Sequence, residues 1–119
     1  MSDVTNEVHC TREHLQQLKE ECKRAISLAE SLERLRQNKD FKEVFIDFYT
    51  EKESIRLVKL LGDQSVNMGN NKEAFRNDIQ ERMIGISRFS EVMRQIYLMA
   101  EQADKTLLDI GYAENEVNV

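Results

Sequence analysis

The chain has 119 residues, of which 33% are charged and 40% hydrophobic, with no proline, no tryptophan and four glycines. This length allows one domain or an elongated pair of helical units. The scarcity of turn-forming residues argues against sandwiches and barrels, and the sequence has no Gly-rich phosphate loop of the kind that nucleotide enzymes use. We therefore expect an all-α protein.

The net charge of −5 is concentrated at the C-terminal end. Residues 101–119 contain five acidic residues and one lysine, a charge of −4. Proteins that grip a DNA duplex non-specifically carry a clustered basic face. The four arginines between residues 76 and 94 recur every six residues, which scatters them around a helix. Nucleic acid is therefore disfavoured as a partner.

The first helix is predicted over residues 11–37, after an N-terminal arm of residues 1–10 that lacks hydrophobic periodicity. Thr11 is its expected N-cap. Its apolar residues alternate in steps of three and four, as in the seam of a coiled coil. These seam residues are Leu15, Leu18, Cys22, Ala25, Ala29 and Leu32.

A second helical segment is predicted over residues 41–61. Asp40 and Glu43 have the spacing of a capping box that would open it. Thr50 and Glu53 repeat the pattern and predict a break or kink near Tyr49–Thr50. Gly62 is the expected terminator.

Four of the eight aromatic residues of the chain lie in this second segment. Aromatic residues at helical spacing supply much of the burial in a small bundle, so we favour a core role for them. A docking platform is the alternative. The residues of this candidate partner surface are Phe41, Phe45, Phe48 and Tyr49.

Residues 63–71 predict a loop, and a third helix is expected over residues 71–110. Gly85 predicts a bend within it, and Gly111 is expected to end it, leaving residues 112–119 as an acidic tail. This helix carries a second seam in steps of three and four. The seam residues are Ile86, Phe89, Met93, Ile96, Ala100, Ala103 and Leu107.

The two seams need partners that bury them. The first helix can pack antiparallel on the last, or the long helix can pair with its copy in another subunit, and the sequence does not separate these solutions. We expect both. The predicted fold is an elongated helical bundle, a single domain over residues 11–111, in which two long coiled-coil-like helices flank a shorter aromatic-rich segment. Its excess helix length favours a homo-oligomer.

The only cysteines and histidines are Cys10, Cys22, His9 and His14. On a helix, His14 and Cys22 lie about 12 Å apart, too far to share one metal ion, and a zinc site at Cys10 and His14 would need a second chain. We expect no metal and no cofactor. A disulfide does not fit helix geometry here, which favours a reducing compartment.

We expect neither an enzyme nor a membrane protein. With both histidines near the start of the chain, no nucleophile–base–acid set emerges, so we name no catalytic residue. The carboxylates alternate with Lys and Arg, as on a solvated helix surface. No hydrophobic run has transmembrane length, and the N-terminus lacks signal-peptide character, which predicts a soluble intracellular protein.

Two parts of the chain share a pattern with a known group of proteins. The first part comprises Leu32-Glu-Arg-Leu35, Asn38-Lys-Asp-Phe41 and the stretch from Phe48 to Asp63, which contains Arg-Leu-Val-Lys-Leu-Leu. The second is Ile84-Gly-Ile-Ser-Arg-Phe89 followed by Glu101-Gln-Ala103. Together they resemble small all-helical accessory or virion-associated proteins of tailed, podovirus-like bacteriophages. The chain departs from that pattern after Asp63, where it has no proline.

The resemblance implies a phage context without a mechanism. It places the protein in the virion or in the cytoplasm of the infected bacterium, with itself and other phage proteins as partners. Our first hypothesis is a non-enzymatic structural or assembly protein that self-associates or docks onto a larger virion assembly. The alternative is a small acidic inhibitor or adaptor that binds a host protein. A DNA-packaging accessory has less support.

Overall fold

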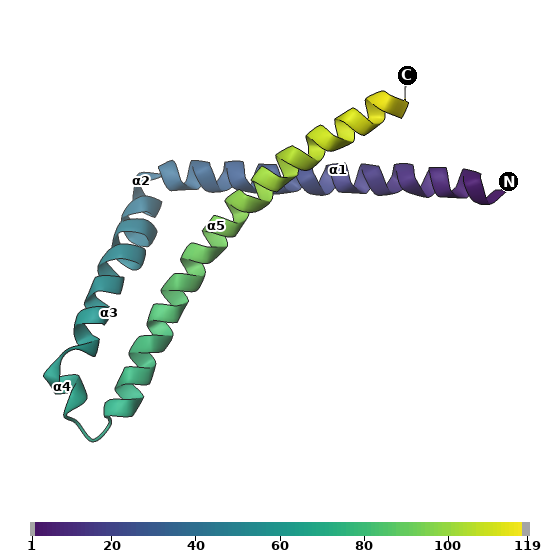
Figure 1. Cartoon of the computed structure of the whole chain (residues 1–119). Helices are drawn as coiled ribbons and strands as arrows, with labels where there is room; N and C mark the ends of the chain where they lie inside the picture. The colour runs from purple at the N-terminus through teal and green to yellow at the C-terminus, as the bar shows by residue number, and fades with distance from the viewer. Residues whose placement is uncertain (1, 118–119) are drawn as a thin grey trace. The chain divides into compact units, whose positions relative to one another are not determined.

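The computed structural model describes the backbone of residues 2–117 and the side chains of residues 12–115. Every element in this range is a helix, which confirms the all-α class, with a long helix at each end of the chain and shorter ones between them. In chain order the elements are α1 (Ser2–Gln37), α2 (Lys39–Phe41), the π-helix η1 (Lys42–Lys52), α3 (Glu53–Leu61), α4 (Gln64–Asn67) and α5 (Lys72–Val117), as Figure 1 shows.

The residue contacts divide the chain into two units, where the sequence predicts a single domain. Unit 1 comprises Met1–Leu32 and Gln95–Val119, and unit 2 comprises Glu33–Arg94. Each long helix therefore contributes to both units.

In unit 1, α1 packs with the C-terminal part of α5, and the two run antiparallel (Figure 1). The Nζ atom of Lys19 on α1 forms an ion pair with Oε1 of Glu114 on α5. The buried side chains come from both helices and are mostly small: Cys22, Ala29, Leu32, Ala103 and Ile110. Small residues at a helix contact let the two backbones approach closely.

Both long helices continue beyond the ends that the sequence predicts. Helix α1 begins at Ser2, so the predicted arm of residues 1–10 is helical from Ser2. Helix α5 runs through Gly111 to Val117, so the tail up to that residue is helical too. Hydrophobic periodicity marks the packed face of a helix and not its full length. A glycine typically ends a helix by taking a positive φ, and no glycine in the described part of the chain does so.

Unit 2 is a hairpin in which η1 and α3 lie along the N-terminal part of α5 (Figure 1). Leu57 is fully buried at its centre, together with Ile79 and Ile86 of α5. Five half-buried side chains surround this core: Tyr49, Leu60, Leu61, Val66 and Met83. The aromatic segment thus lies alongside α5, and the predicted bend at Gly85 does not interrupt that helix.

The turn between α1 and η1 is capped by a residue other than the predicted one. Asn38 takes an extended backbone, and its Oδ1 accepts a hydrogen bond of 3.0 Å from the backbone N–H of Phe41. Asp40 is already inside the helix. An N-cap needs a non-helical backbone, so Asn38 performs the capping that the sequence assigns to Asp40 with Glu43.

The predicted break at Tyr49–Thr50 is absent. The helix instead changes from the π-helix η1 to the α-helix α3 at Glu53. In η1 the hydrogen bonds span five residues, as in the bond from the N–H of Glu53 to the carbonyl of Phe48. Thr50 donates its hydroxyl back to the carbonyl of Ile46, and Ser54 does the same to Thr50 over 2.6 Å. Such back-bonding keeps these hydroxyls within a continuous helix.

The predicted loop of residues 63–71 contains the short helix α4. Oδ1 of Asp63, its N-cap, accepts hydrogen bonds of 2.8 Å from both the N–H and the hydroxyl of Ser65. The side chain of Asn67 then donates to the carbonyls of Leu61 and Asp63, each over 2.9 Å. The connection between α3 and α5 is therefore held by side-chain hydrogen bonds as well as by packing.

Candidate interaction surfaces

The predicted seam residues that fall in unit 1 point into that unit. On α1, Cys22, Ala29 and Leu32 are buried and the other seam residues, Leu15, Leu18 and Ala25, are half-buried. On α5, Ala103 is buried, and Ile96, Ala100 and Leu107 are half-buried. Within unit 1 the two seams therefore cover each other in one chain.

The remaining seam residues belong to unit 2. Ile86 is buried in the hairpin core, and Phe89 and Met93 are half-buried. Phe89 contacts two rings of the predicted partner surface. It stacks on Phe45 with the ring centroids 5.9 Å apart, and it meets Tyr49 edge-on at 5.5 Å. These are the offset and T-shaped geometries that aromatic pairs prefer.

The four residues of the predicted partner surface divide between core and surface. Phe41 and Tyr49 are half-buried, and Phe41 lies 5.1 Å from Phe45 between ring centroids. Phe45 remains 43% exposed and Phe48 57% exposed. The segment therefore supplies the hairpin core through Tyr49 and an accessible apolar surface through Phe45 and Phe48.

An open cleft of about 440 Å³ lies beside these rings, between the η1–α3 segment and α5. Its lining residues are Phe48, Tyr49, Glu53, Arg82, Gly85 and Ile86. A Cβ added at Gly85 would lie 3.7 Å from the hydroxyl of Tyr49, at ordinary contact distance. Val92 stands 57% exposed one turn beyond Phe89. We call the surface formed by Phe45, Phe48, Gly85, Phe89 and Val92 the aromatic face.

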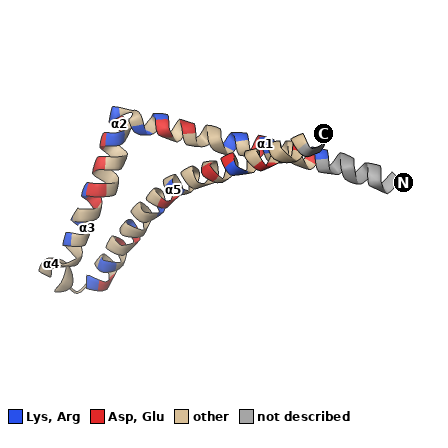
Figure 2. Ribbon diagram, turned by 45° about the horizontal axis from the view of Figure 1, so that its top comes forward, with Lys and Arg blue, Asp and Glu red and all other residues tan. Residues whose placement is uncertain are grey.

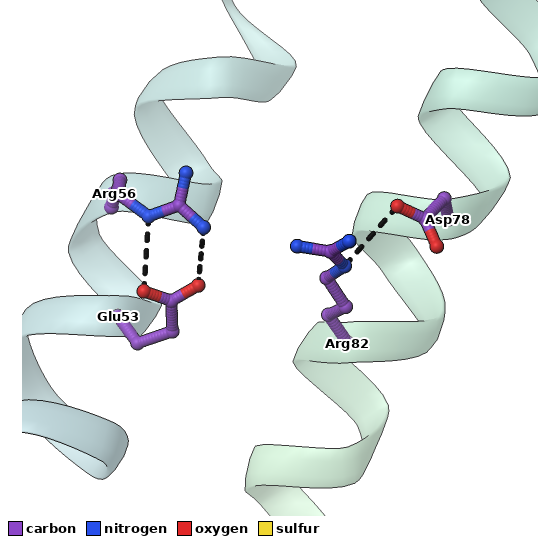
Figure 3. A network of polar contacts seen from close by, with 4 residues as sticks. All are labelled: Glu53, Arg56, Asp78 and Arg82. Atoms are coloured by element: carbon purple, nitrogen blue, oxygen red, sulfur yellow. Dashed lines mark hydrogen bonds and ion pairs between the residues drawn. The ribbon is translucent and has the colours of Figure 1, made fainter.

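Two of the residues that line the cleft, Glu53 and Arg82, are charged. Each pairs with a neighbour on its own helix, and we call the four residues Glu53, Arg56, Asp78 and Arg82 the charged quartet. On α3, Arg56 donates from Nε to Oε2 of Glu53 over 2.9 Å and from Nη2 to Oε1 over 2.5 Å. On α5, Arg82 pairs through Nε with Asp78 at 3.1 Å. Figure 3 shows Glu53 level with Arg82, and Arg56 level with Asp78. Acid and base thus alternate along each helix and between the two helices.

The electrostatics of the quartet keep Glu53 ionised. Hydrogen bonding from Arg56 lowers the pKa of the Glu53 carboxyl, and the positive charges of Arg56 and Arg82 act in the same direction against partial desolvation. The same contact raises the pKa of Arg56. A carboxylate held in its charged form suits recognition of a cation better than donation of a proton.

Sequence reasoning missed Gly85, Val92 and the quartet as parts of this surface. Arg82 lies four residues before Ile86, at a position where a further apolar seam residue would fall. The available signal was a second apolar series in α5 that also steps by four and three, through Gly85, Phe89 and Val92. Because it shares Phe89 with the first series, the apolar stripe of the helix is wider than one partner covers.

The described part of the chain contains neither a metal-binding cluster nor a helix that could span a membrane. No group of three or more His, Cys, Asp or Glu side chains there could hold a metal ion. The side chains of His9 and Cys10 lie outside the described residues, while Cys22 is a buried free thiol. Among the described helices, none has the length and apolarity needed to cross a membrane. Basic and acidic residues alternate along α1 and α3 (Figure 2).

No protein-family model, curated protein or solved structure matches this chain.

Proposed function

We propose that this chain is a non-enzymatic structural or assembly protein of a tailed phage that acts through its helices. It self-associates or docks onto a larger virion assembly, and it is located in the virion or in the cytoplasm of the infected bacterium. The phage context rests on the resemblance described above, which is carried by residues 32–35, 38–41, 48–63, 84–89 and 101–103. The mode of action rests on the surface of the molecule.

The balance of exposed and buried apolar side chains carries this proposal. Within residues 12–115, fifteen large hydrophobic residues are exposed, against eight buried hydrophobic ones. Isolated exposed hydrophobic residues are ordinary, but contiguous ones mark interaction sites. On unit 2 one of them, Phe48, lines an open apolar cleft together with Gly85 and Ile86. A protein that works by helix-mediated association would present such a surface.

The charged groups support a binding role over a catalytic one. The carboxyl pKa values of both Glu53 and Asp63 are lowered, each mainly by side-chain hydrogen bonding. Neither group is poised to release or take up a proton near neutral pH, as general acid–base catalysis requires. Ion pairs within the described helices join basic side chains to acids, among them Arg56 to Glu53, Arg82 to Asp78, Arg94 to Glu91 and Lys105 to Glu101.

The first experiment is absolute mass by light scattering across about a hundredfold range of concentration. Self-association predicts a mass above that of one chain, either at every concentration or rising with it. The mass of a single chain throughout the range would contradict self-association. Docking would then be tested by sedimentation with purified particles of the phage that encodes the chain, and absence from the particle fraction would contradict docking.

A substitution in the unit 1 seam tests whether that seam holds the fold. We expect Ile96→Asp to reduce helix content and melting temperature, because it places an unpaired charge at a half-buried position. Leu108→Asp is the matched control, since Leu108 lies on the same helix and is 62% exposed. Unchanged mass and melting in Ile96→Asp would contradict the assignment.

The alternative, an inhibitor or adaptor that binds a host protein, depends on the acidic residues 112–119. Glu114 in this segment already pairs with Lys19, and the helix continues to Val117, so the segment is less available as a free acidic arm. Deletion of residues 112–119 tests this hypothesis, because it should abolish binding to the host protein and leave the mass of the assembly unchanged. A salt-dependent shift of DNA would favour the packaging hypothesis.

A further inference from the structure

We propose that two copies of this chain pair through the aromatic face and the charged quartet of unit 2. The two-fold axis runs parallel to the helices, along the cleft between α3 and α5. This inference rests on the proposed self-association and assigns it a surface, a symmetry and a set of contacts.

The apolar part of this surface remains exposed among the residues that the structure describes. Phe45 and Phe48 are 43% and 57% exposed, which together equals the surface of about one complete phenylalanine side chain, of the order of 200 Å². Val92 adds a further side chain that is 57% exposed. A two-helix hairpin buries one stripe of each helix, and α5 carries a wider stripe than η1 and α3 cover.

The charged quartet complements a second copy of itself. An isologous interface presents the same patch from both subunits, so the patch must match its own image. A two-fold rotation about an axis along the cleft places α3 of one copy opposite α5 of the other. Every residue keeps its height along that axis. Glu53 then faces the partner subunit's Arg82, and Arg56 faces the partner subunit's Asp78. Every acid therefore meets a base, because an acid on one helix lies level with a base on the other (Figure 3).

The same rotation gives a favourable order of helices. Within one hairpin, η1–α3 and α5 are antiparallel, since Phe45 stacks on Phe89 while Leu57 packs with Ile79. The rotation places α3 of one copy over α5 of the other without reversing either helix. Each helix then has antiparallel neighbours, as in an up-and-down four-helix bundle, and neighbouring helix dipoles oppose one another.

The available area is sufficient for a specific pair. The eleven residues of η1 and the nine of α3 extend for about 30 Å. A surface two helices wide, each about 10 Å across, offers roughly 600 Å² per copy. Two copies would bury about 1,200 Å², which is the lower limit of stable protein–protein interfaces.

The charges favour a second copy over other occupants. The quartet holds two acids and two bases, so it has no net charge. A nucleic acid or a uniformly acidic peptide would meet Glu53 and Asp78 as well as the arginines. A membrane surface would have to desolvate all four groups, at a cost that pairing with a complementary quartet avoids.

The test uses two charge variants of the full chain. The acidic variant carries Arg56→Glu and Arg82→Glu, and the basic variant carries Glu53→Lys and Asp78→Lys. Each variant alone places like charges against like across the two-fold axis, and we expect each to pair at least tenfold more weakly than the wild type. An equimolar mixture should restore pairing, now between one acidic and one basic chain. Light scattering and pull-down with one tagged variant measure both outcomes.

Mixing separates the interface from a role inside one chain. A quartet that only stabilised its own hairpin would be damaged equally in both variants, and mixing them would change nothing. Helix content by circular dichroism, recorded for each variant and for the mixture, shows whether folding differs. Failure of the mixture to pair, with helix content intact, would overturn the proposal.

Phe48→Asp and Ile55→Asp test the aromatic face with a matched pair of substitutions. Both side chains are 57% exposed, but Ile55 lies two residues before the buried Leu57 and therefore on the opposite side of α3. We expect Phe48→Asp to abolish pairing and Ile55→Asp to leave it unchanged. An oligomer that survives Phe48→Asp and both charge variants would refute this surface while self-association stands. A wild type that is monomeric throughout would refute self-association itself.

Discussion

Arg76, in the first turns of α5, donates a hydrogen bond of 2.6 Å from Nη1 to Oδ1 of Asn67 at the end of α4. The amide nitrogen of Asn67 reaches in the other direction, to the carbonyls of Leu61 and Asp63. One half-buried side chain therefore joins the end of α3, the short helix α4 and the start of α5. This junction sets where the chain reverses direction in unit 2.

We expect Asn67→Ala to destabilise the protein by about 1–3 kcal/mol, because it leaves backbone carbonyls and a guanidinium without their partner. Urea unfolding measures the change. Asn70→Ala is the control, since Asn70 is an exposed residue of the adjoining turn, and its removal should change the free energy of unfolding by less than about 0.5 kcal/mol. Equal effects of the two substitutions would contradict the junction.

Leu57 is the one side chain in the described part of the chain that is both large and fully buried. Leu57→Ala should lower the free energy of unfolding by about 2–5 kcal/mol, since it removes buried methyl groups and leaves a cavity. Val58, next in the chain, is 56% exposed, and Val58→Ala should have little effect. A loss of less than about 1 kcal/mol for Leu57→Ala would mean that the hairpin core lies elsewhere.

Ala103 lies in the contact between α1 and α5 in unit 1 and is 5% exposed. Ala103→Leu should destabilise by about 1–3 kcal/mol, because a larger side chain there forces the helices apart. Ala113 is exposed on the same helix, so Ala113→Leu provides the control. Thermal unfolding followed by circular dichroism compares them. A stabilised Ala103→Leu variant would show that the contact has unfilled space.

Asp63 links stability to pH. Hydrogen bonds from the Ser65 hydroxyl and backbone N–H lower the pKa of the Asp63 carboxyl below its ordinary value of 3.8. Its contribution is therefore complete above that value and is lost as the pH falls through the lowered pKa of the folded state. We expect the wild type to exceed Asp63→Asn in stability above pH 3.8 and to lose this advantage as the pH falls below that value. An advantage independent of pH would contradict the linkage.

Gly111 lies within α5, and a Cβ at this position would meet nothing within 4 Å. Gly111→Ala should stabilise the protein by about 0.5–1 kcal/mol, the difference in helix propensity. Ala113→Gly, two residues further along the helix, should cost a similar amount. If the helix ended at Gly111 as a terminator, alanine there would destabilise, and a lowered melting temperature would reveal it.

The sequence by itself predicted the helices and their apolar sides. Steps of three and four placed Cys22, Ala29 and Ala103 on seams, and the structure buries all three. The sequence also predicted the end of α3 before Gly62, because glycine is a common helix terminator. These features depend on periodicity and backbone chemistry within a few residues, which a sequence displays directly.

Local sequence signals did not determine which of several suitable residues caps or ends a helix. Asn38 and Asp40 can each cap a helix, and the one with an extended backbone does so. Gly111 can end a helix or continue it. The helix continues there because Ile110 is buried and Glu114 pairs with Lys19, so packing holds the chain in helical form on both sides of the glycine.

Only the tertiary structure decided which helices pair. It assigned α1 to the C-terminal part of α5, and η1 with α3 to the N-terminal part. It also placed Glu53 level with Arg82, a relationship between residues far apart in the chain (Figure 3). The physical reason is that hydrophobic burial has no direction. An apolar seam indicates that a helix packs against a partner. Which helix becomes that partner depends on the helix lengths, the turns and the side-chain shapes of the whole chain.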